Sequence, residues 1–177
     1  MTITLAIDTS TSRTCVGVIE AGQLLWSGFK DGATAHGPAL PALVQEAIKG
    51  HAIDEVVVGM GPGPFTGLRI GIAFAQSFAL ARGICVRGVC SLDAIAAQVN
   101  ERDFIITVDA RRKEVYWARY KDGVRIGEPA VNFPKDVTGV EVYSDLYPDL
   151  TAMVALSGNV TEPIYLRHPD AVATADR

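Results

Sequence analysis

The sequence has little cysteine and little histidine, and this narrows the chemistry open to the chain. Three cysteines and three histidines occur in 177 residues. Cys15, Cys85 and Cys90 have no Cys-x-x-Cys spacing, so neither a disulfide framework nor a zinc knuckle is expected. Leu40 stands four residues after His36, so the sequence has no His-x-x-x-His metal pair. Because a Gly-x-Ser-x-Gly nucleophile elbow is also missing, we expect no metal ligand and no catalytic residue.

A basic excess and a membrane-length apolar run are missing as well. Sixteen Lys and Arg stand against twenty Asp and Glu, a formal net charge of −4. Proteins that bind nucleic acid on their own usually carry a strong basic excess. The charge-free stretch Ile70–Ala81 has twelve residues, whereas a membrane-spanning helix needs about 20. The strand-like start Thr2–Ile7 does not resemble a signal peptide, so we expect a cytoplasmic protein without membrane contact.

The remaining composition is that of a globular chain with alternating strands and helices. Hydrophobic residues make up 49% and charged residues 20%, and the mean hydropathy is +0.22. A short run at Val56–Val58, apolar on both faces, predicts a strand in the middle of a sheet. The other predicted strands are Ile3–Ile7, Thr14–Glu20, Gln23–Phe29, Ile84–Val89, Ile105–Val108, Glu114–Tyr120, Val124–Gly127 and Met153–Leu156. The predicted helices are Gly37–Lys49, about Leu68–Arg82, and Ser91–Val99 with Ser91 as N-cap, and residues 129–149 are expected to be loop-like.

An internal repeat relates the two halves of the chain. A strand ending in Asp8 and a hairpin turning at Gly22 recur, 101 residues later, as a strand ending in Asp109 and a turn at Gly123. We therefore predict a duplicated α/β fold with a lobe at residues 1–101 and a short lobe at 102–167. Residues 168–177 are expected to form a disordered tail.

The repeated strand–Asp–hairpin unit is typical of actin-like ATPase domains. There, backbone N–H groups of both hairpins grip phosphates and the two acids hold Mg²⁺ through water. Asp8, Thr9, Ser10 and Asp109 are the candidate residues, and the alternative is that both acids merely end strands. The roughly 64 residues from Phe104 to Arg167 are few for a complete second lobe, which favours a vestigial site.

A glycine-rich segment, Gly61–Gly67, resembles a phosphate loop without matching one. The Walker pattern needs Lys-Ser or Lys-Thr after the last glycine, and Leu68-Arg69 stands there. The dinucleotide pattern needs its third glycine one residue earlier. The segment is therefore predicted to be a stiff strand-to-helix turn.

The helix that follows carries a ridge of small residues and almost no charge. It could pack against the sheet or against a second protein, and we expect a dimer or partner contact, because the charge-free surface extends around the helix. The ridge residues are Gly67, Gly71, Ala75 and Ala79, and the flanking interface residues are Leu68, Ile70, Phe74 and Phe78. The run Arg111–Lys113 leaves two alternatives open, a contact with nucleic-acid phosphates or a solvated hairpin end.

Four motifs resemble the bacterial TsaB (YeaZ) family over nearly the whole chain. They are Leu5-Ala6-Ile7-Asp8-Thr9-Ser10-Thr11, the glycine-rich Gly61–Gly71, Asp109–Ala118 and Tyr165-Leu166-Arg167. The resemblance implies an actin-like (ASKHA, ribonuclease H-like) fold with two lobes. It also implies a non-catalytic subunit in the formation of N6-threonylcarbamoyladenosine in tRNA, grouped with M22 peptidases by homology only.

The same resemblance implies partners. They are a second copy of the chain, a TsaD-type catalytic paralogue and a TsaE-type ATPase, with tRNA reached only through the complex. No cofactor is required, and weak ATP or ADP binding is compatible with the fold. Pro64 departs from the serine usual in the family. Two alternatives stay open: an actin-like ATPase or sugar-kinase-like enzyme using Asp8 and Asp109, and a stand-alone tRNA-binding module.

Overall fold

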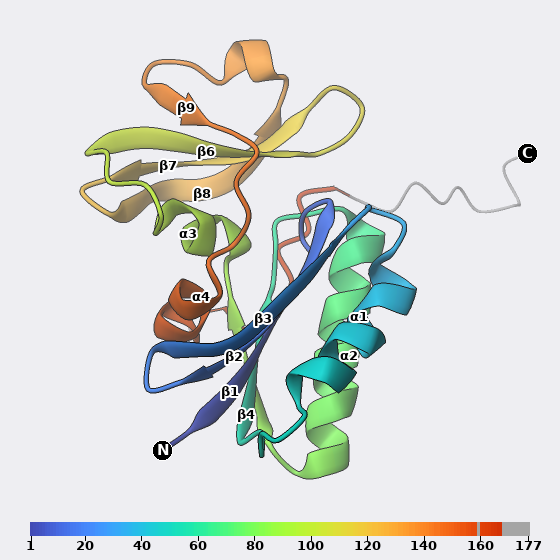
Figure 1. Ribbon diagram of the computed structural model, residues 1–177. Coiled ribbons are helices and arrows are strands. Elements are labelled where there is room, and N and C mark those ends of the chain that lie inside the picture. The colour runs from blue at the N-terminus through green and yellow to red at the C-terminus, as the bar shows by residue number, and fades with distance from the viewer. Residues whose placement is uncertain (159, 168–177) are drawn as a thin grey trace, which may run out of the picture.

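The fold consists of two β-sheets, one above the other in Figure 1, with helices packed around the larger sheet. The computed structural model describes residues 1–158 and 160–167. The larger sheet has the strand order β3-β2-β1-β4-β5 and the smaller sheet β8-β7-β6-β9. The strands are β1 (Ile3–Asp8), β2 (Arg13–Glu20), β3 (Gln23–Asp31), β4 (Glu55–Gly59), β5 (Cys85–Val89), β6 (Asp103–Asp109), β7 (Val115–Lys121), β8 (Val124–Asn132) and β9 (Glu141–Tyr143).

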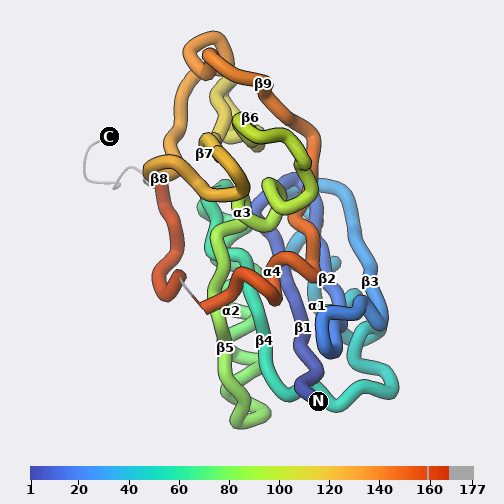
Figure 2. Tube along the Cα trace, turned by 90° about the vertical axis from the view of Figure 1, so that its left-hand side faces the viewer, coloured from blue at the N-terminus to red at the C-terminus, as the bar shows by residue number. Residues whose placement is uncertain are grey.

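Helices cover both faces of the larger sheet. On one face, α1 (His36–Ala47) packs on β2 and β3, and α2 (Phe65–Arg82) packs on β4 and β5. On the other face, α4 (Leu150–Leu156) lies against β1, β2 and β4 (Figures 1 and 2). Helix α3 (Ser91–Ala96) contacts both α4 and strand β6, so it connects the two sheets. No helix in the described part of the chain is long and apolar enough to cross a membrane.

The predicted central strand is confirmed. Val56, Val57 and Val58 are each 0% exposed, and β4 lies between β1 and β5. Val56 and Val58 belong to the main core under α1 and α2, whereas Val57 packs with Met153 of α4. A strand covered on both sides has no place for polar side chains, which accounts for the uniform valine run.

The predicted repeat is visible in the backbone. Strand β1 ends at Asp8 and β6 ends at Asp109, and the hairpin turns Ala21–Gly22 and Asp122–Gly123 have φ pairs of 49°/79° and 49°/78°. Two consecutive positive φ values give the turn twist that suits a two-residue hairpin. Each sheet then adds a parallel strand to its first strand, β4 to β1 and β9 to β6. Within the described residues the smaller sheet lacks a counterpart of β5, so the second lobe is abbreviated, as expected.

One predicted strand is a helix. The segment predicted as the strand Met153–Leu156 is the C-terminal part of α4. The carboxylate of Asp149 caps this helix, because its Oδ1 accepts a hydrogen bond from the backbone N–H of Ala152 at 2.8 Å. A short apolar run fits a strand or a helix equally well. Here the N-cap at Asp149 favours the helix. The region 129–149, expected to be loop-like, also holds the end of β8, the 3-10 helix Pro134–Asp136 and strand β9.

The proposed lobe boundary at residues 101 and 102 falls in the connection between α3 and β6. It stays a prediction, because α4 follows the smaller sheet in sequence but packs on the larger one. The expected tail, residues 168–177, lies outside the described residues.

Candidate functional site

The side chain of Asp8 is enclosed in the protein and hydrogen-bonded through both oxygens. It is 0% exposed. Its Oδ1 accepts hydrogen bonds from the backbone N–H (2.8 Å) and the hydroxyl (2.7 Å) of Ser10, and its Oδ2 accepts one from the hydroxyl of Ser91 (2.6 Å). Burial raises the pKa of Asp8, and the bonds from Ser91 and Ser10 act in the opposite direction. Ser91 was predicted to cap α3, but Cys90 is the N-cap and the Ser91 hydroxyl binds Asp8 instead.

The glycine-rich segment between β4 and α2 lies directly on the loop that follows Asp8. A Cβ atom at Gly63 would lie 2.5 Å from the carbonyl oxygen of Ser10, and one at Gly67 would lie 2.7 Å from that of Thr9. The hydroxyl of Thr9 donates a hydrogen bond to the Gly67 carbonyl at 2.7 Å. Backbones approach this closely only where a side chain is missing. The predicted strand-to-helix turn is confirmed, and it covers the Thr9–Ser10 loop.

These residues do not fit a magnesium–nucleotide site. Mg²⁺ needs carboxylate, phosphate and water oxygens around it, whereas the oxygens of Asp8 are buried and already hold serine donors. Asp109, the expected second acid, is exposed and accepts a hydrogen bond from the backbone N–H of Arg111 at 2.9 Å. Among the described residues, no group of three or more His, Cys, Asp or Glu could hold a metal ion. The interpretation of Asp8, Thr9, Ser10 and Asp109 as a vestigial phosphate site stays a prediction.

His36 has a structural position next to this loop. It is 3% exposed, and its Nδ1 lies 2.8 Å from the hydroxyl oxygen of Thr14. Burial lowers the pKa of His36, with the charge of Asp8 acting in the opposite direction. The imidazole is therefore neutral near pH 7 and joins the start of α1 to β2.

The small-residue ridge of α2 faces the inside of the protein. A Cβ atom at Gly71 would lie 2.3 Å from Oγ1 of Thr9. Ala75 and Ala79 are 0% and 2% exposed and belong to the main core. The ridge, which includes Gly67, lets α2 approach the Thr9 loop and the sheet. The prediction that this ridge faces a partner was therefore wrong, and the alternative of internal packing holds.

The remaining predicted interface residues divide between core and surface. Leu68 is 0% exposed, whereas Ile70, Phe74 and Phe78 are half-buried. A dimer contact through α2 stays a prediction, but its residues must come from the solvent side of the helix. We call this side the α2 outer face; it comprises Phe65, Thr66, Arg69, Ile70, Ala73, Gln76 and Leu80.

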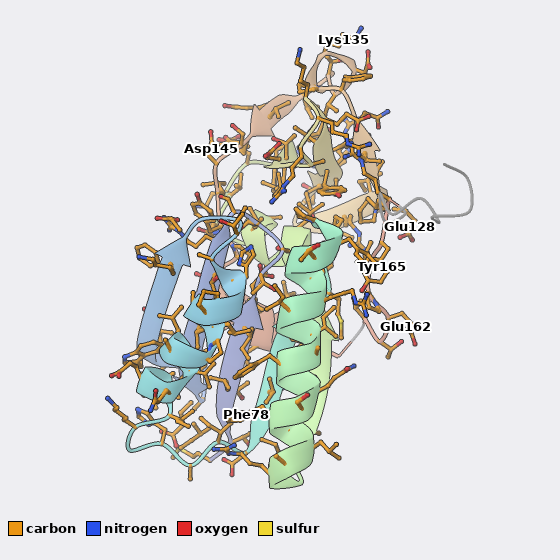
Figure 3. The ribbon with its side chains drawn as sticks, turned by 90° about the vertical axis from the view of Figure 1, so that its right-hand side faces the viewer. Phe78, Glu128, Lys135, Asp145, Glu162 and Tyr165 are labelled. Atoms are coloured by element: carbon orange, nitrogen blue, oxygen red, sulfur yellow. The ribbon has the colours of Figure 1, made fainter. Side chains whose placement is uncertain are left out.

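The α2 outer face carries an exposed leucine near its C-terminal end and a shallow hollow over its first turns. Leu80 is 84% exposed. A hollow of about 400 Å³ lies over the first turns of the helix, lined by residues between Phe65 and Ala73. The ring of Tyr165 packs on that of Phe65 with centroids 5.0 Å apart, and Figure 3 shows Tyr165 beside the N-terminal half of α2. Apolar groups exposed along one side of a helix favour a protein partner.

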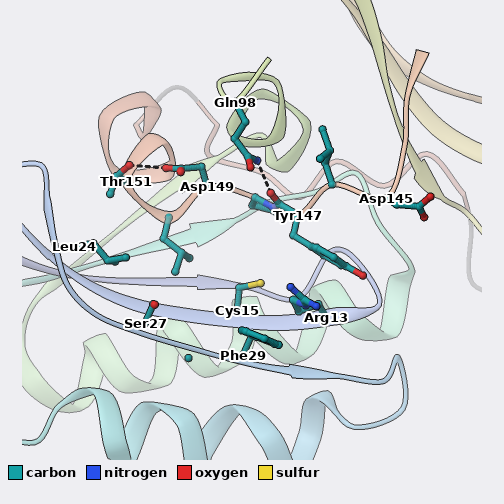
Figure 4. A pocket seen from close by; sticks show the side chains of 14 residues that line it. Arg13, Cys15, Leu24, Ser27, Phe29, Gln98, Asp145, Tyr147, Asp149 and Thr151 are labelled. Atoms are coloured by element: carbon teal, nitrogen blue, oxygen red, sulfur yellow. Dashed lines mark hydrogen bonds between the residues drawn. The ribbon is translucent and has the colours of Figure 1, made fainter. Parts of the chain in front are cut away.

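A second hollow, which sequence reasoning missed, lies between β2, β3 and the segment before α4 (Figure 4). Its volume is about 360 Å³. At one end the guanidinium of Arg13 lies between the rings of Phe29 and Tyr147, 4.0 Å and 3.9 Å from their centroids. Nε and Nη2 of Arg13 donate to both carboxylate oxygens of Asp31 at 2.7 and 3.1 Å. We call these contacts of Arg13 the Arg13 clamp. They fix the segment that runs from the smaller sheet to α4 against the larger sheet.

Solved structures share this architecture. A crystal structure from Pseudomonas aeruginosa, described as an uncharacterised protein with similarity to peptidase YEAZ, is 26% identical, covers 94% of this chain and is itself covered completely, with a TM-score of 0.79. The ethanolamine utilisation protein EutJ of Carboxydothermus hydrogenoformans shares only the fold, with 12% identity and a TM-score of 0.51 over 75% of this chain and 52% of that one. The duplicated meander with its parallel fourth strand places the chain in the actin-like (ASKHA) class.

The family follows from the sequence comparisons. A family model described as TsaD, tRNA N6-adenosine threonylcarbamoyltransferase, matches residues 32–170. The tRNA threonylcarbamoyladenosine biosynthesis protein TsaB of Escherichia coli is 32% identical over 70% of this chain. The chain belongs to the TsaB (YeaZ) family.

The chain spans only part of some of these relatives. It covers 58% of E. coli TsaB and 56% of an uncharacterised protein of Mycobacterium leprae, to which it is 38% identical over 97% of its own length. It covers 92% of an uncharacterised protein of Mycobacterium tuberculosis, with 40% identity over 94% of this chain.

Proposed function

We propose that the chain is a non-catalytic scaffold and dimerisation subunit for the formation of N6-threonylcarbamoyladenosine. The modified base is the adenosine next to the anticodon, in tRNAs that read codons beginning with A. The chain acts in the cytoplasm with a TsaD-type catalytic paralogue and a TsaE-type ATPase, and the complex binds the tRNA. No cofactor is required under this proposal, and any ATP or ADP binding is weak.

The enclosure of Asp8 is the observation that carries the proposal. An actin-like enzyme needs an open acid at the end of its first strand to hold a metal ion and phosphates. Here that acid is 0% exposed, and the hydroxyls of Ser10 and Ser91 occupy its oxygens. An actin-like scaffold without chemistry needs no open acid, so this arrangement supports a structural role in the complex.

The α2 outer face is the surface through which we propose that the chain associates. A second copy and the catalytic paralogue would compete for it, since both would cover the same exposed apolar groups around Ala73 and Leu80. A stable contact of this kind buries on the order of 1,600 Å² in total.

Reconstitution from purified components tests the proposed function. The chain, the TsaD-type and TsaE-type proteins, ATP, threonylcarbamoyl adenylate as the donor and an unmodified tRNA transcript are mixed, and the nucleosides are measured by mass spectrometry. We expect the modified nucleoside with the full set, a strong reduction when the chain is left out, and none with the chain alone. Transfer by the chain alone at a rate close to that of the full set would overturn the proposal.

The alternative of an actin-like ATPase using Asp8 and Asp109 makes a separate prediction. Such an enzyme binds Mg-ATP tightly on its own and loses activity with Asp8→Asn. A calorimetric titration of the isolated chain with Mg-ATP distinguishes the two functions, because a scaffold gives weak binding or none.

A further inference from the structure

The turn between β6 and β7 has an unusual backbone. Arg111, Arg112 and Lys113, which we call the cationic turn, have φ values of 59°, 54° and 64°. Left-handed backbone is unfavourable for residues other than Gly, Asn and Asp, and it normally occurs at single positions. All three residues are exposed. Three consecutive long side chains in this conformation indicate a turn maintained against its local preference, which is a feature of functional segments.

The internal repeat shows how this turn differs from its counterpart. Through the offset of 101 residues, the cationic turn corresponds to Ser10–Ser12 in the first half of the chain. Ser10 is 1% exposed and its hydroxyl is used to bind Asp8. In the first copy Ser10 and Thr11 are therefore buried and the glycine-rich segment covers the loop, whereas Ser12 is exposed. The second copy presents cations to solvent.

Neighbouring residues hold the cationic turn in place from behind. The carboxylate of Asp109 accepts a hydrogen bond from the N–H of Arg111 at 2.9 Å, and the N–H of Glu114 donates to the carbonyl of Arg111 at 3.1 Å. Nη1 of Arg167 donates to the carbonyl of Ala110 at 2.8 Å, and its guanidinium also pairs with Glu114. Arg167 thus neutralises the acid next to the turn.

In the part of the chain that the structure describes, the charges of Arg111 and Lys113, at the two ends of the turn, have no neighbouring group that neutralises them as Arg167 neutralises Glu114. Within residues 1–158 and 160–167, the guanidinium of Arg111 and the ammonium of Lys113 form no ion pair and no side-chain hydrogen bond. Most other arginines of the described chain are matched with a carboxylate. These are Arg13, Arg87, Arg102, Arg119, Arg125 and Arg167.

We propose that the cationic turn is a contact for the phosphodiester backbone of RNA, independent of base sequence. Exposed cations on a preset backbone suit a chain of repeated phosphates, whose binding is dominated by charge neutralisation and counterion release. A nucleotide is the less suitable anion, because the Asp8 loop, the counterpart of the turn in the first half of the chain, is closed. The identity of the polyanion as RNA rests on the proposed function. The net charge of −4 means that the contact is local and weak on its own.

Salt-dependent binding of an unmodified tRNA transcript to the full chain tests this contact. The double variant Arg111→Asn/Lys113→Asn removes both charges, and asparagine tolerates left-handed backbone, so the turn is preserved. The logarithm of the affinity is plotted against that of the salt concentration between about 50 and 200 mM. We expect the slope to fall by about 2, since each lost phosphate contact reduces it by about 1. Circular dichroism confirms that the variant is folded.

The matched control is Arg82→Asn/Lys121→Asn. It also removes one arginine and one lysine, both exposed. Arg82 is the last residue of α2 and belongs to a different element from the turn, and Lys121 ends β7, roughly 20 Å along the strand from the turn. We expect this variant to keep the slope of the unchanged chain.

Three results would overturn the contact. The first is tRNA binding that does not depend on salt or is missing in the unchanged chain. The second is an equal slope for the two double variants. The third is displacement of the RNA by ATP at equal phosphate concentration, which would make the turn a nucleotide site. The proposed function fails separately, because a chain that binds no RNA but restores base modification refutes only the contact. A chain that binds RNA but does not restore modification refutes only the scaffold role.

Discussion

Ser91 donates a hydrogen bond to Asp8 over 83 residues of sequence, with Oγ and Oδ2 2.6 Å apart. Ser91 is the first residue of α3, the helix that contacts both sheets, and Asp8 ends the first strand. The bond therefore attaches the connecting helix to the larger sheet from inside the protein. A buried hydrogen bond to a carboxyl group is strong because no water competes for it.

Replacing Ser91 tests how much this attachment contributes to stability. Ser91→Ala leaves the Asp8 carboxylate buried with one donor fewer, so we expect the free energy of unfolding to fall by about 1–3 kcal/mol. Urea denaturation measures this loss, and we expect the slope of the unfolding free energy against urea concentration to be unchanged. Ser77→Ala, at an exposed position of α2, is the control and should change little. Equal midpoints for the two variants would show that the bond is not stabilising.

The raised pKa of Asp8 predicts a pH dependence with a definite sign. The folded protein holds the proton of Asp8 more tightly than the unfolded chain, in which the pKa of an aspartate has its ordinary value of 3.8. Its contribution to stability is therefore complete below pH 3.8 and is lost as pH rises through the folded-state pKa. Asp8→Asn should remain folded and cannot titrate, so its stability relative to the unchanged protein should increase from acid to neutral pH.

Thermal or urea unfolding of both proteins at several pH values gives this difference. Subtracting the two free energies of unfolding at each pH cancels the contributions of Asp31 and Asp103. The pKa values of these two groups are lowered by hydrogen bonds from Arg13 and Arg119 in both proteins. A difference that is flat with pH would mean that Asp8 titrates normally. In the reconstituted complex, Asp8→Asn should reduce activity less than replacement of the His-x-x-x-His metal pair that the family resemblance implies for the catalytic paralogue, since we interpret the acid as vestigial.

The contact between the glycine-rich segment and the Ser10 loop predicts a large effect of one methyl group. A Cβ atom at Gly63 would lie 2.5 Å from a backbone oxygen of Ser10, so Gly63→Ala should lower stability by about 1–3 kcal/mol or more. Gly37→Ala is the matched control, because a Cβ there meets nothing within 4 Å. The control should be neutral or stabilise by up to about 1 kcal/mol. Similar melting temperatures for both variants would contradict the close approach.

Arginine substitutions on α2 separate its two faces. Ala75 is 0% exposed, so Ala75→Arg should unfold the protein. Ala73 is on the α2 outer face, so Ala73→Arg should remain folded, lose self-association and fail to bind the catalytic paralogue. Ala42→Arg, at an exposed position of α1, is the control and should associate normally. Light scattering and pull-down measure the outcomes, and a folded Ala73→Arg variant that associates like the control would place the contact elsewhere.

The clamp around Arg13 predicts a difference between two surface ion pairs. Arg13→Ala removes contacts with two aromatic rings, worth about 1–2 kcal/mol together. Arg102→Ala breaks only the exposed pair with Asp122, whose side chains are 82% and 55% exposed, and should change stability by less than about 1 kcal/mol. Chemical denaturation of both variants decides. The pKa of Asp31 is lowered by the bond from Arg13, so this pair stabilises above the normal carboxyl pKa, and the deficit of Arg13→Ala should shrink in acid.

The strands, the hairpins and the duplication could be predicted from the sequence because their determinants are local. Alternating side chains and the turns at Gly22 and Gly123 need no knowledge of distant residues. The direction of the α2 ridge could not be predicted in this way. Small residues spaced four apart indicate a side of the helix that another segment approaches closely, but they do not identify that segment. Here it is the loop at Thr9, whose hydroxyl donates a hydrogen bond to the carbonyl of Gly67, 58 residues later in the sequence. The partner of Asp8 and the ring of Tyr147 over Arg13 were missed for the same reason, since both are long-range contacts.

The return of α4 to the larger sheet affects how the chain behaves while it is being synthesised. Val57 and Val89 are covered by Met153 of this helix, which leaves the ribosome last among the described helices. The roughly 50 residues between α3 and α4 take about 3–10 s to add at ribosomal rates. During that interval the nascent chain exposes an apolar sheet face, and a chaperone that binds such surfaces has several seconds to capture it.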